Sequence, residues 1–127
     1  MLKIAVVEDQ TEVRESLCQF IRQYAGEQGL QAEVKPFADG AVIAEGYQPG
    51  YDIIFLDVEM PGKSGIEVGR SIKEKNPYAL IFIVSFTEQY LDDAMDFQVF
   101  RYIEKASLPD RIERNLRDAL VAYRNTN

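Results

Sequence analysis

Short apolar runs alternate with longer stretches of helical spacing along the sequence. The apolar runs predict strands, and apolar residues that recur every three or four positions predict amphipathic helices. The run at 53–56 is apolar throughout, which is typical of a strand covered on both faces of a sheet. The run at 32–35 alternates and is typical of an edge strand. Strands are therefore expected at residues 2–7, 32–35, 53–56, 80–84 and 99–103.

A helical stretch is expected after each of these strands. The first is expected to end near Gly26 or Gly29, because glycine commonly terminates helices. Ser64 is placed to cap a later helix, with Glu67 at the capping-box position. The last helix carries Pro109 in its first turn, where proline is tolerated. The helical stretches lie at 13–24, 40–47, 64–76, 88–95 and 108–123.

This alternation predicts an α/β fold. Strands that alternate with helices form a parallel sheet with helices on both faces, which is a three-layer sandwich. Because connections between parallel strands are almost always right-handed, few topologies remain. We expect a doubly wound five-stranded parallel sheet with strand order 2-1-3-4-5. The length of 127 residues fits a single domain over 1–127.

The composition excludes several functions. Histidine is absent, which excludes a Ser-His-Asp triad, a His-ligated zinc site and a phosphohistidine relay on this chain. Cys18 is the only cysteine, so no internal disulfide can form, and the cytoplasm is the expected compartment. The net charge of −7 argues against nucleic-acid binding by this domain alone. No apolar run approaches the length of a membrane span, so no membrane partner is expected.

Polar side chains follow four of the expected strands. Such sheets bind ligands beyond the carboxyl ends of the strands, where Glu8, Asp9, Asp57, Ser85 and Lys105 are expected to converge. Each of these residues alone is more often a helix cap, a turn residue or a solvated charge. Three crowded carboxylates, however, repel one another unless a cation lies among them. Oxygen ligands favour a hard cation, so the pattern predicts a site for Mg²⁺ or Mn²⁺.

Asp57 is the strongest candidate for covalent chemistry. It ends a buried apolar strand at an open edge of the sheet, shortly before the abrupt Pro61-Gly62 turn. An aspartate can accept a phosphoryl group and form an acyl phosphate. The metal would offset charge on that group, and Lys105 and Ser85 would contact its oxygens.

These residues strongly resemble the receiver domain of bacterial two-component response regulators. The family has an acidic pair after strand 1, a phosphoacceptor Asp before a Met-Pro-Gly-type turn, a Ser or Thr after strand 4 and a Lys after strand 5. In this sequence the pattern falls on Glu8 with Asp9, on Asp57, on Ser85 and on Lys105. The resemblance implies the flavodoxin-like receiver fold and a signalling switch that is not an enzyme.

The resemblance implies further residue roles. The backbone carbonyl of Glu59 would complete the metal shell. Tyr102, three residues before Lys105, would be an aromatic switch residue, although an ordinary half-buried strand aromatic is the alternative. The segment 99–105 is similar to receivers that carry LytTR-type DNA-binding output domains. Any such output domain would lie outside this chain.

Two positions depart from the family pattern. The family usually has a proline after the lysine, often with a cis bond, whereas this sequence has Ala106. A cis bond before a residue other than proline costs about 3–4 kcal/mol, so a trans Lys105–Ala106 bond is expected, which puts the reach of Lys105 in question. Phe86 replaces the small residue that usually follows Ser85, and we expect it to crowd the mouth of the site.

The expected function is therefore a phosphoacceptor switch. Asp57 would take a phosphoryl group from a sensor histidine kinase with Mg²⁺. The change would reach the face formed by the fourth strand, fourth helix, fifth strand and fifth helix, to control transcription. Charges on this face would support a weak symmetric homodimer, since exposed ion pairs contribute only about 0–1 kcal/mol each. The charged residues concerned are Asp92, Asp93, Asp96, Arg111, Arg114 and Arg117.

Two other classes of function remain as alternatives. A pseudo-receiver would have the same fold and bind proteins without phosphorylation. A related fold is the second alternative, but a flavodoxin needs a hydroxyl- and glycine-rich loop where Glu8 and Asp9 stand. A haloacid-dehalogenase-type phosphatase would use Asp57-x-Glu59 but would leave the early acidic pair unexplained.

Overall fold

The structure is a computed structural model that describes residues 1–40, 43, 50–60 and 64–126. The helical stretch expected at 40–47 falls almost wholly outside these residues, and so does the expected Pro61-Gly62 turn.

Five strands form one parallel sheet in the order β2-β1-β3-β4-β5, which confirms the predicted topology. The second strand lies at one edge, as its alternating sequence predicted. The strands are β1 (Leu2–Val7), β2 (Ala32–Phe37), β3 (Ile53–Asp57), β4 (Leu80–Ser85) and β5 (Arg101–Glu104). The described helices are α1 (Thr11–Glu27), α3 (Gly65–Lys75), α4 (Leu91–Asp96) and α5 (Leu108–Thr126), with a 3₁₀ turn η1 (Lys105–Ser107).

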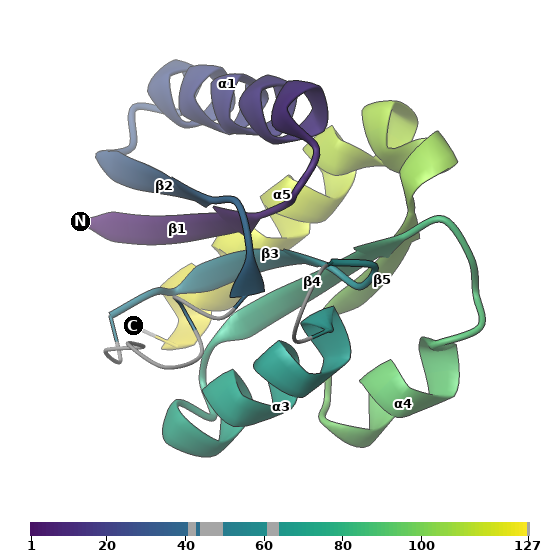
Figure 1. Ribbon diagram of the computed structural model, residues 1–127. Helices are drawn as coiled ribbons and strands as arrows, with labels where there is room; N and C mark the ends of the chain where they lie inside the picture. The colour runs from purple at the N-terminus through teal and green to yellow at the C-terminus, as the bar shows by residue number, and fades with distance from the viewer. Residues whose placement is uncertain (41–42, 44–49, 61–63, 127) are drawn as a thin grey trace.

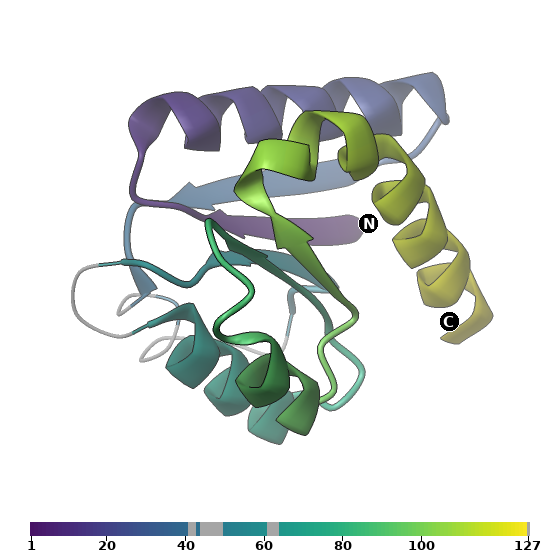
Figure 2. The same ribbon diagram turned by 90° about the vertical axis from the view of Figure 1, so that its right-hand side faces the viewer.

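The helices cover both faces of the sheet and form three layers. Helices α1 and α5 lie on one face, whereas α3 and α4 lie on the other (Figures 1 and 2). Each central strand sends alternate side chains into the two cores, so that Phe55 faces α1 and α5 while Ile54 and Leu56 face α3. The rings of Phe55 and Phe82 stack with centroids 4.5 Å apart in the core under α1 and α5.

Local sequence explains where the elements begin and end. The Ser64 side chain accepts a hydrogen bond from the Glu67 amide and caps α3 as predicted. Helix α1 ends before Gly29, whose φ of 67° is a conformation that glycine adopts without strain.

Helix α4 is shorter than the 88–95 stretch that its spacing predicted. The Ser85 hydroxyl accepts a hydrogen bond from the Thr87 amide, and the Thr87 hydroxyl accepts one from Gln89. Such side-chain contacts compete with helix formation, which explains why the helix begins only at Leu91. In the described part of the chain, no helix has the length and apolar character needed to cross a membrane.

The core under α1 and α5 allows a direct test of the fold. Leu116 of α5 is 1% exposed, and its replacement by alanine should lower the free energy of unfolding by about 2–5 kcal/mol. Val121 lies on the same helix but is 50% exposed, so Val121→Ala should change it by about 0.5 kcal/mol or less. Urea titrations measure both values. Equal small effects would contradict the packing of α5 against the sheet.

Candidate functional site

Three carboxylates converge where β1 and β3 end. Glu8 and Asp9 follow β1, and Asp57 is the last residue of β3, beside β1 in the sheet. One carboxylate oxygen from each residue lies within 4.8 Å of the others. Glu8 and Asp57 are buried, whereas Asp9 is exposed. The parallel register therefore places the three residues together, as the strand ends predicted.

The Lys105 ammonium reaches this cluster. Its Nζ lies 3.0 Å from Glu8 Oε1 and 3.2 Å from Asp57 Oδ2, and all three side chains are almost fully buried. No cis peptide bond occurs among the described residues, so the expected trans Lys105–Ala106 bond is present. The reach of Lys105, which this bond put in question, is sufficient to contact both carboxylates.

The surroundings of Asp57 disfavour its charged form. Burial raises the pKa of Asp57 to about 8, and the charge of Glu8 adds to this rise, while Lys105 opposes it. Burial by itself would lower the pKa of Lys105, but contacts with Glu8 and Asp57 outweigh burial and raise it. The lysine is thus held in its charged form, yet one ammonium does not offset three carboxylates.

The oxygen atoms of Asp57 remain available to a ligand. Neither of them accepts a well-oriented hydrogen bond from a described residue, although both are buried. Buried polar atoms normally have hydrogen-bond partners. The Asp57 carboxylate pairs with Lys105 but accepts no hydrogen bond from a described residue, which fits a site that takes a cation. The ligands offered are all carboxylate oxygens, which suit Mg²⁺ better than a softer metal.

Ser85 lies at the end of β4, completely buried, and donates a hydrogen bond of 2.6 Å to Oε1 of Glu59. The Ser85 hydroxyl also accepts the Thr87 amide hydrogen bond at 3.2 Å. Tyr102 of β5 is half-buried, and its hydroxyl donates to the Thr87 backbone carbonyl. The side chains of Glu59, Ser85 and Tyr102 and the backbone of Thr87 thus form one hydrogen-bonded chain. The sequence pointed to Glu59 for its backbone carbonyl and in the phosphatase alternative, but it did not predict that its side chain binds Ser85.

Phe86 contacts Lys105. The Lys105 Nζ lies 4.4 Å from the centre of the Phe86 ring, a cation–π geometry. The ring itself is 64% exposed. Phe86 was expected to crowd the mouth of the site, and its position beside the Lys105 ammonium places it at the rim.

Gly65 is a residue of the site that sequence reasoning missed. A Cβ atom built at Gly65 would lie 2.2 Å from the backbone oxygen of Asp57, a distance that real contacts do not reach. Its amide donates to the Val58 carbonyl at 3.2 Å. The start of α3 therefore packs directly on the backbone that carries Asp57. The sequence signal that could have identified Gly65 is its place directly after the capping Ser64.

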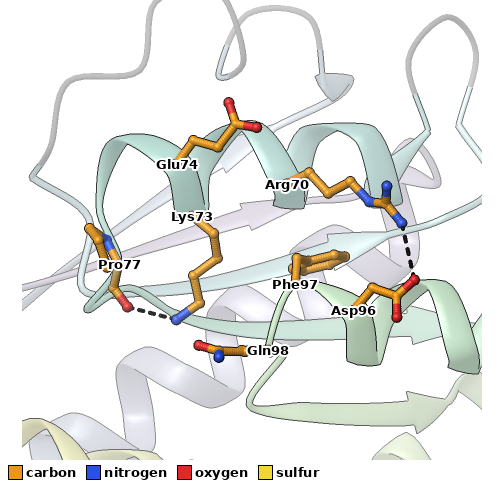
Figure 3. A pocket seen from close by; sticks show the side chains of 7 residues that line it. All are labelled: Arg70, Lys73, Glu74, Pro77, Asp96, Phe97 and Gln98. Carbon is orange, nitrogen blue, oxygen red and sulfur yellow. Dashed lines mark hydrogen bonds and ion pairs between the residues drawn. The ribbon is translucent and has the colours of Figure 1, made fainter.

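A separate hollow of about 360 Å³ lies between α3 and α4, at the edge where β4 and β5 begin (Figure 3). Arg70 pairs with Asp96 across it at 3.8 Å, and the Lys73 ammonium donates to the Pro77 carbonyl. It lies at the opposite edge of the sheet from the carboxylates and shares no residue with them.

Comparison with known proteins agrees with this geometry. Residues 4–117 match the family model of the response regulator receiver domain. LytR of Staphylococcus aureus is 34% identical over 116 residues, which cover 89% of this chain and 45% of LytR. BtsR of Escherichia coli is 31% identical over 117 residues, which cover 91% of this chain and 47% of BtsR.

A solved structure of a response regulator protein is also similar to this chain. TrrA of Thermotoga maritima, in complex with Mg(2+)-BeF, is similar with a TM-score of 0.77 at 28% identity; the match covers 94% of this chain and 99% of TrrA. The chain belongs to the response regulator receiver domain family. Receiver domains bind Mg²⁺ at an acidic pocket, which here is the cluster of Glu8, Asp9 and Asp57, and sensor histidine kinases phosphorylate them. The chain spans about half or less of the length of the curated relatives it matches.

The raised pKa of Asp57 predicts a pH-dependent stability. Folding favours the protonated form of the Asp57 carboxyl group. The stability that this group contributes is therefore fully present below its unfolded pKa of about 3.9 and is lost as the pH rises towards about 8. At pH 8–9 the free energy of unfolding of the neutral variant Asp57→Asn should therefore exceed that of the metal-free wild type by roughly 1–3 kcal/mol. Urea titrations measure both values. At pH 4 the two proteins should be nearly equal. A difference that is independent of pH would show that the carboxyl group is not perturbed as described.

Proposed function

We propose that Asp57 is the phosphoacceptor of this domain and that its phosphorylation is the signal. The observation that carries the proposal is the buried Asp57 carboxylate, whose oxygens accept no well-oriented hydrogen bond from the described residues and lie beside Glu8, Asp9 and Lys105. A side-chain oxygen of Asp57 attacks the phosphorus of the donor, and the bond from phosphorus to the donor's leaving atom breaks with its electron pair. The product is an acyl phosphate on Asp57.

Each neighbouring side chain has a role in this transfer. Mg²⁺, or Mn²⁺ with the same ligand chemistry, offsets negative charge on the phosphoryl group when bound. Glu8, Asp9, Asp57 and the Glu59 carbonyl would hold it. The Lys105 ammonium, which lies 3.2 Å from Asp57 Oδ2, neutralises a phosphoryl oxygen at the same place. The Ser85 hydroxyl is the donor for another phosphoryl oxygen.

The phosphoryl donor is a sensor histidine kinase, the class of enzyme that phosphorylates receiver domains. A groove of about 440 Å³ between α1 and α5 opens beside Lys105, and its walls include Val13, Phe20 and Leu108. This mostly apolar groove adjoins the acidic cluster, which supports it as the place where the kinase holds the domain during transfer.

Tyr102 and the surface around it carry the signal outward. A charge-assisted hydrogen bond from Ser85 to the phosphoryl group would displace the β4–α4 loop, to which the Tyr102 hydroxyl is bound. The residues Asp92, Asp93, Asp96, Arg111, Arg114 and Arg117 are all exposed on α4 and α5. Asp96 pairs with Arg70 of α3, and Arg101 pairs with Asp118 at 3.3 Å, so part of this charge is balanced within one chain.

We propose that this face forms a weak homodimer after phosphorylation and that residues 1–127 act as the receiver of a longer transcription regulator. The similarity to LytR and BtsR, named as transcriptional regulatory proteins, supports control of transcription.

The phosphoacceptor role is tested by labelling with a small acyl phosphate such as acetyl phosphate in the presence of Mg²⁺. Asp57→Asn should abolish incorporation of phosphate, because the amide cannot form the acyl phosphate. Asp52→Asn is the matched control, since Asp52 lies at the other end of β3 and contacts the Lys3 amide, and it should label like the wild type. Labelled peptide mapped by mass spectrometry identifies the acceptor. A folded wild type that takes up no phosphate would favour a phosphorylation-independent interaction module.

The dimer is tested by sedimentation at low salt with and without beryllofluoride, an acyl-phosphate mimic. The mimic should produce a concentration-dependent dimer that weakens as salt is added, because exposed ion pairs are screened. Arg114→Glu should weaken it, whereas Glu33→Lys, on the far edge strand, should leave it unchanged. A monomer at every concentration would reject association through the α4–β5–α5 face.

A further inference from the structure

The Glu59 carboxylate engages the hydroxyl that the phosphoryl group needs. Ser85 Oγ donates to Glu59 Oε1 at 2.6 Å, the length of a strong hydrogen bond to a charged oxygen. The second oxygen, Oε2, is buried and accepts no hydrogen bond from the described residues. Ser85 is therefore the one described hydrogen-bond donor to this carboxylate.

A serine hydroxyl has one proton to donate. Ser85 can give it to Glu59 or to a phosphoryl oxygen on Asp57, but not to both at once. The two acceptors are close in the chain, since Glu59 comes two residues after Asp57 and Asp57 pairs with Val84 in the sheet, next to Ser85. A phosphoryl group on Asp57 could therefore bind the Ser85 hydroxyl only after the hydrogen bond from Ser85 to Glu59 breaks.

The same hydroxyl also fixes the loop that follows β4. It accepts the Thr87 amide at 3.2 Å, and the Thr87 carbonyl accepts the Tyr102 hydroxyl. A change at Glu59 can therefore reach Tyr102 through three consecutive hydrogen bonds.

We propose that Glu59 is a positioning residue that holds Ser85 in the unphosphorylated arrangement and competes with the aspartyl phosphate for its hydroxyl. The proposal rests on the phosphoacceptor role of Asp57. Activation exchanges the acceptor of the Ser85 proton, and the exchange leaves Glu59 without this donor in a partly buried position. Glu59 therefore shifts the domain towards its unphosphorylated arrangement and raises the threshold for switching.

The test is a double-mutant cycle on the affinity for beryllofluoride with Mg²⁺. Glu59→Ala should tighten binding about tenfold more in the native background than in the Ser85→Ala background, because only a serine has a proton to release. Glu59→Gln removes the charge but keeps an acceptor oxygen, so it should tighten binding less than Glu59→Ala. If Glu59→Ala gives the same factor in both backgrounds, Glu59 acts only through its charge and the proposal is wrong.

A second measurement needs neither metal nor mimic. The solvent exchange of the Thr87 amide, followed by NMR, should become several-fold faster in Glu59→Ala but not in Glu59→Gln. The Val58 amide, which donates to the Val84 carbonyl, should be unchanged and serves as the internal control. Unaltered Thr87 exchange in Glu59→Ala would overturn the proposal even if beryllofluoride binds. Failure of the wild type to bind beryllofluoride would instead count against the phosphoacceptor role, while the Thr87 result still decides whether Glu59 holds the loop.

Discussion

Uncompensated negative charge at the carboxyl edge of the sheet is the constraint on which the rest of the site depends. Glu8, Asp9 and Asp57 bring three carboxylates together and Lys105 supplies one ammonium, so full ionisation leaves a formal charge of 1 − 3 = −2. Burial makes this charge costly, and the pKa of Asp57 rises to about 8 in response. A divalent cation restores neutrality. The cluster thus favours the ligand that phosphoryl transfer also requires.

The fold imposes this crowding. Parallel strands end at one edge, and the close pairing of β1 with β3 leaves Glu8 and Asp57 no way to separate. Gly65 tightens the arrangement, since any side chain there would collide with the Asp57 backbone. The two apolar cores on either side of the sheet hold these strands rigidly, which is why the charges must be neutralised by a ligand and not by movement.

The sequence predicted what depends on backbone topology. Apolar runs located all five strands, and the residues just after them named Glu8, Asp9, Asp57, Ser85 and Lys105, which the structure brings to one edge. It did not predict what depends on side-chain rotamers. The hydrogen bond from Ser85 to Glu59 joins residues 26 apart in sequence, and the contact of Lys105 with Phe86 joins η1 to the loop after β4. No local pattern encodes such pairs. Likewise, the spacing of residues predicted a helix from residue 88, but the hydrogen bonds to the Ser85 and Thr87 hydroxyls make α4 begin only at Leu91.

The most direct test of the account is calorimetric titration of the metal-free domain with Mg²⁺. The wild type should bind one ion weakly, because Mg²⁺ gives up its water ligands reluctantly. Asp9→Asn removes one of the three carboxylates without touching the Lys105 contacts and should lower the affinity markedly, whereas Asp52→Asn at the far end of β3 should not change it. Equal affinity of the wild type and Asp9→Asn would contradict the claim that this acidic cluster is the magnesium and phosphoryl site.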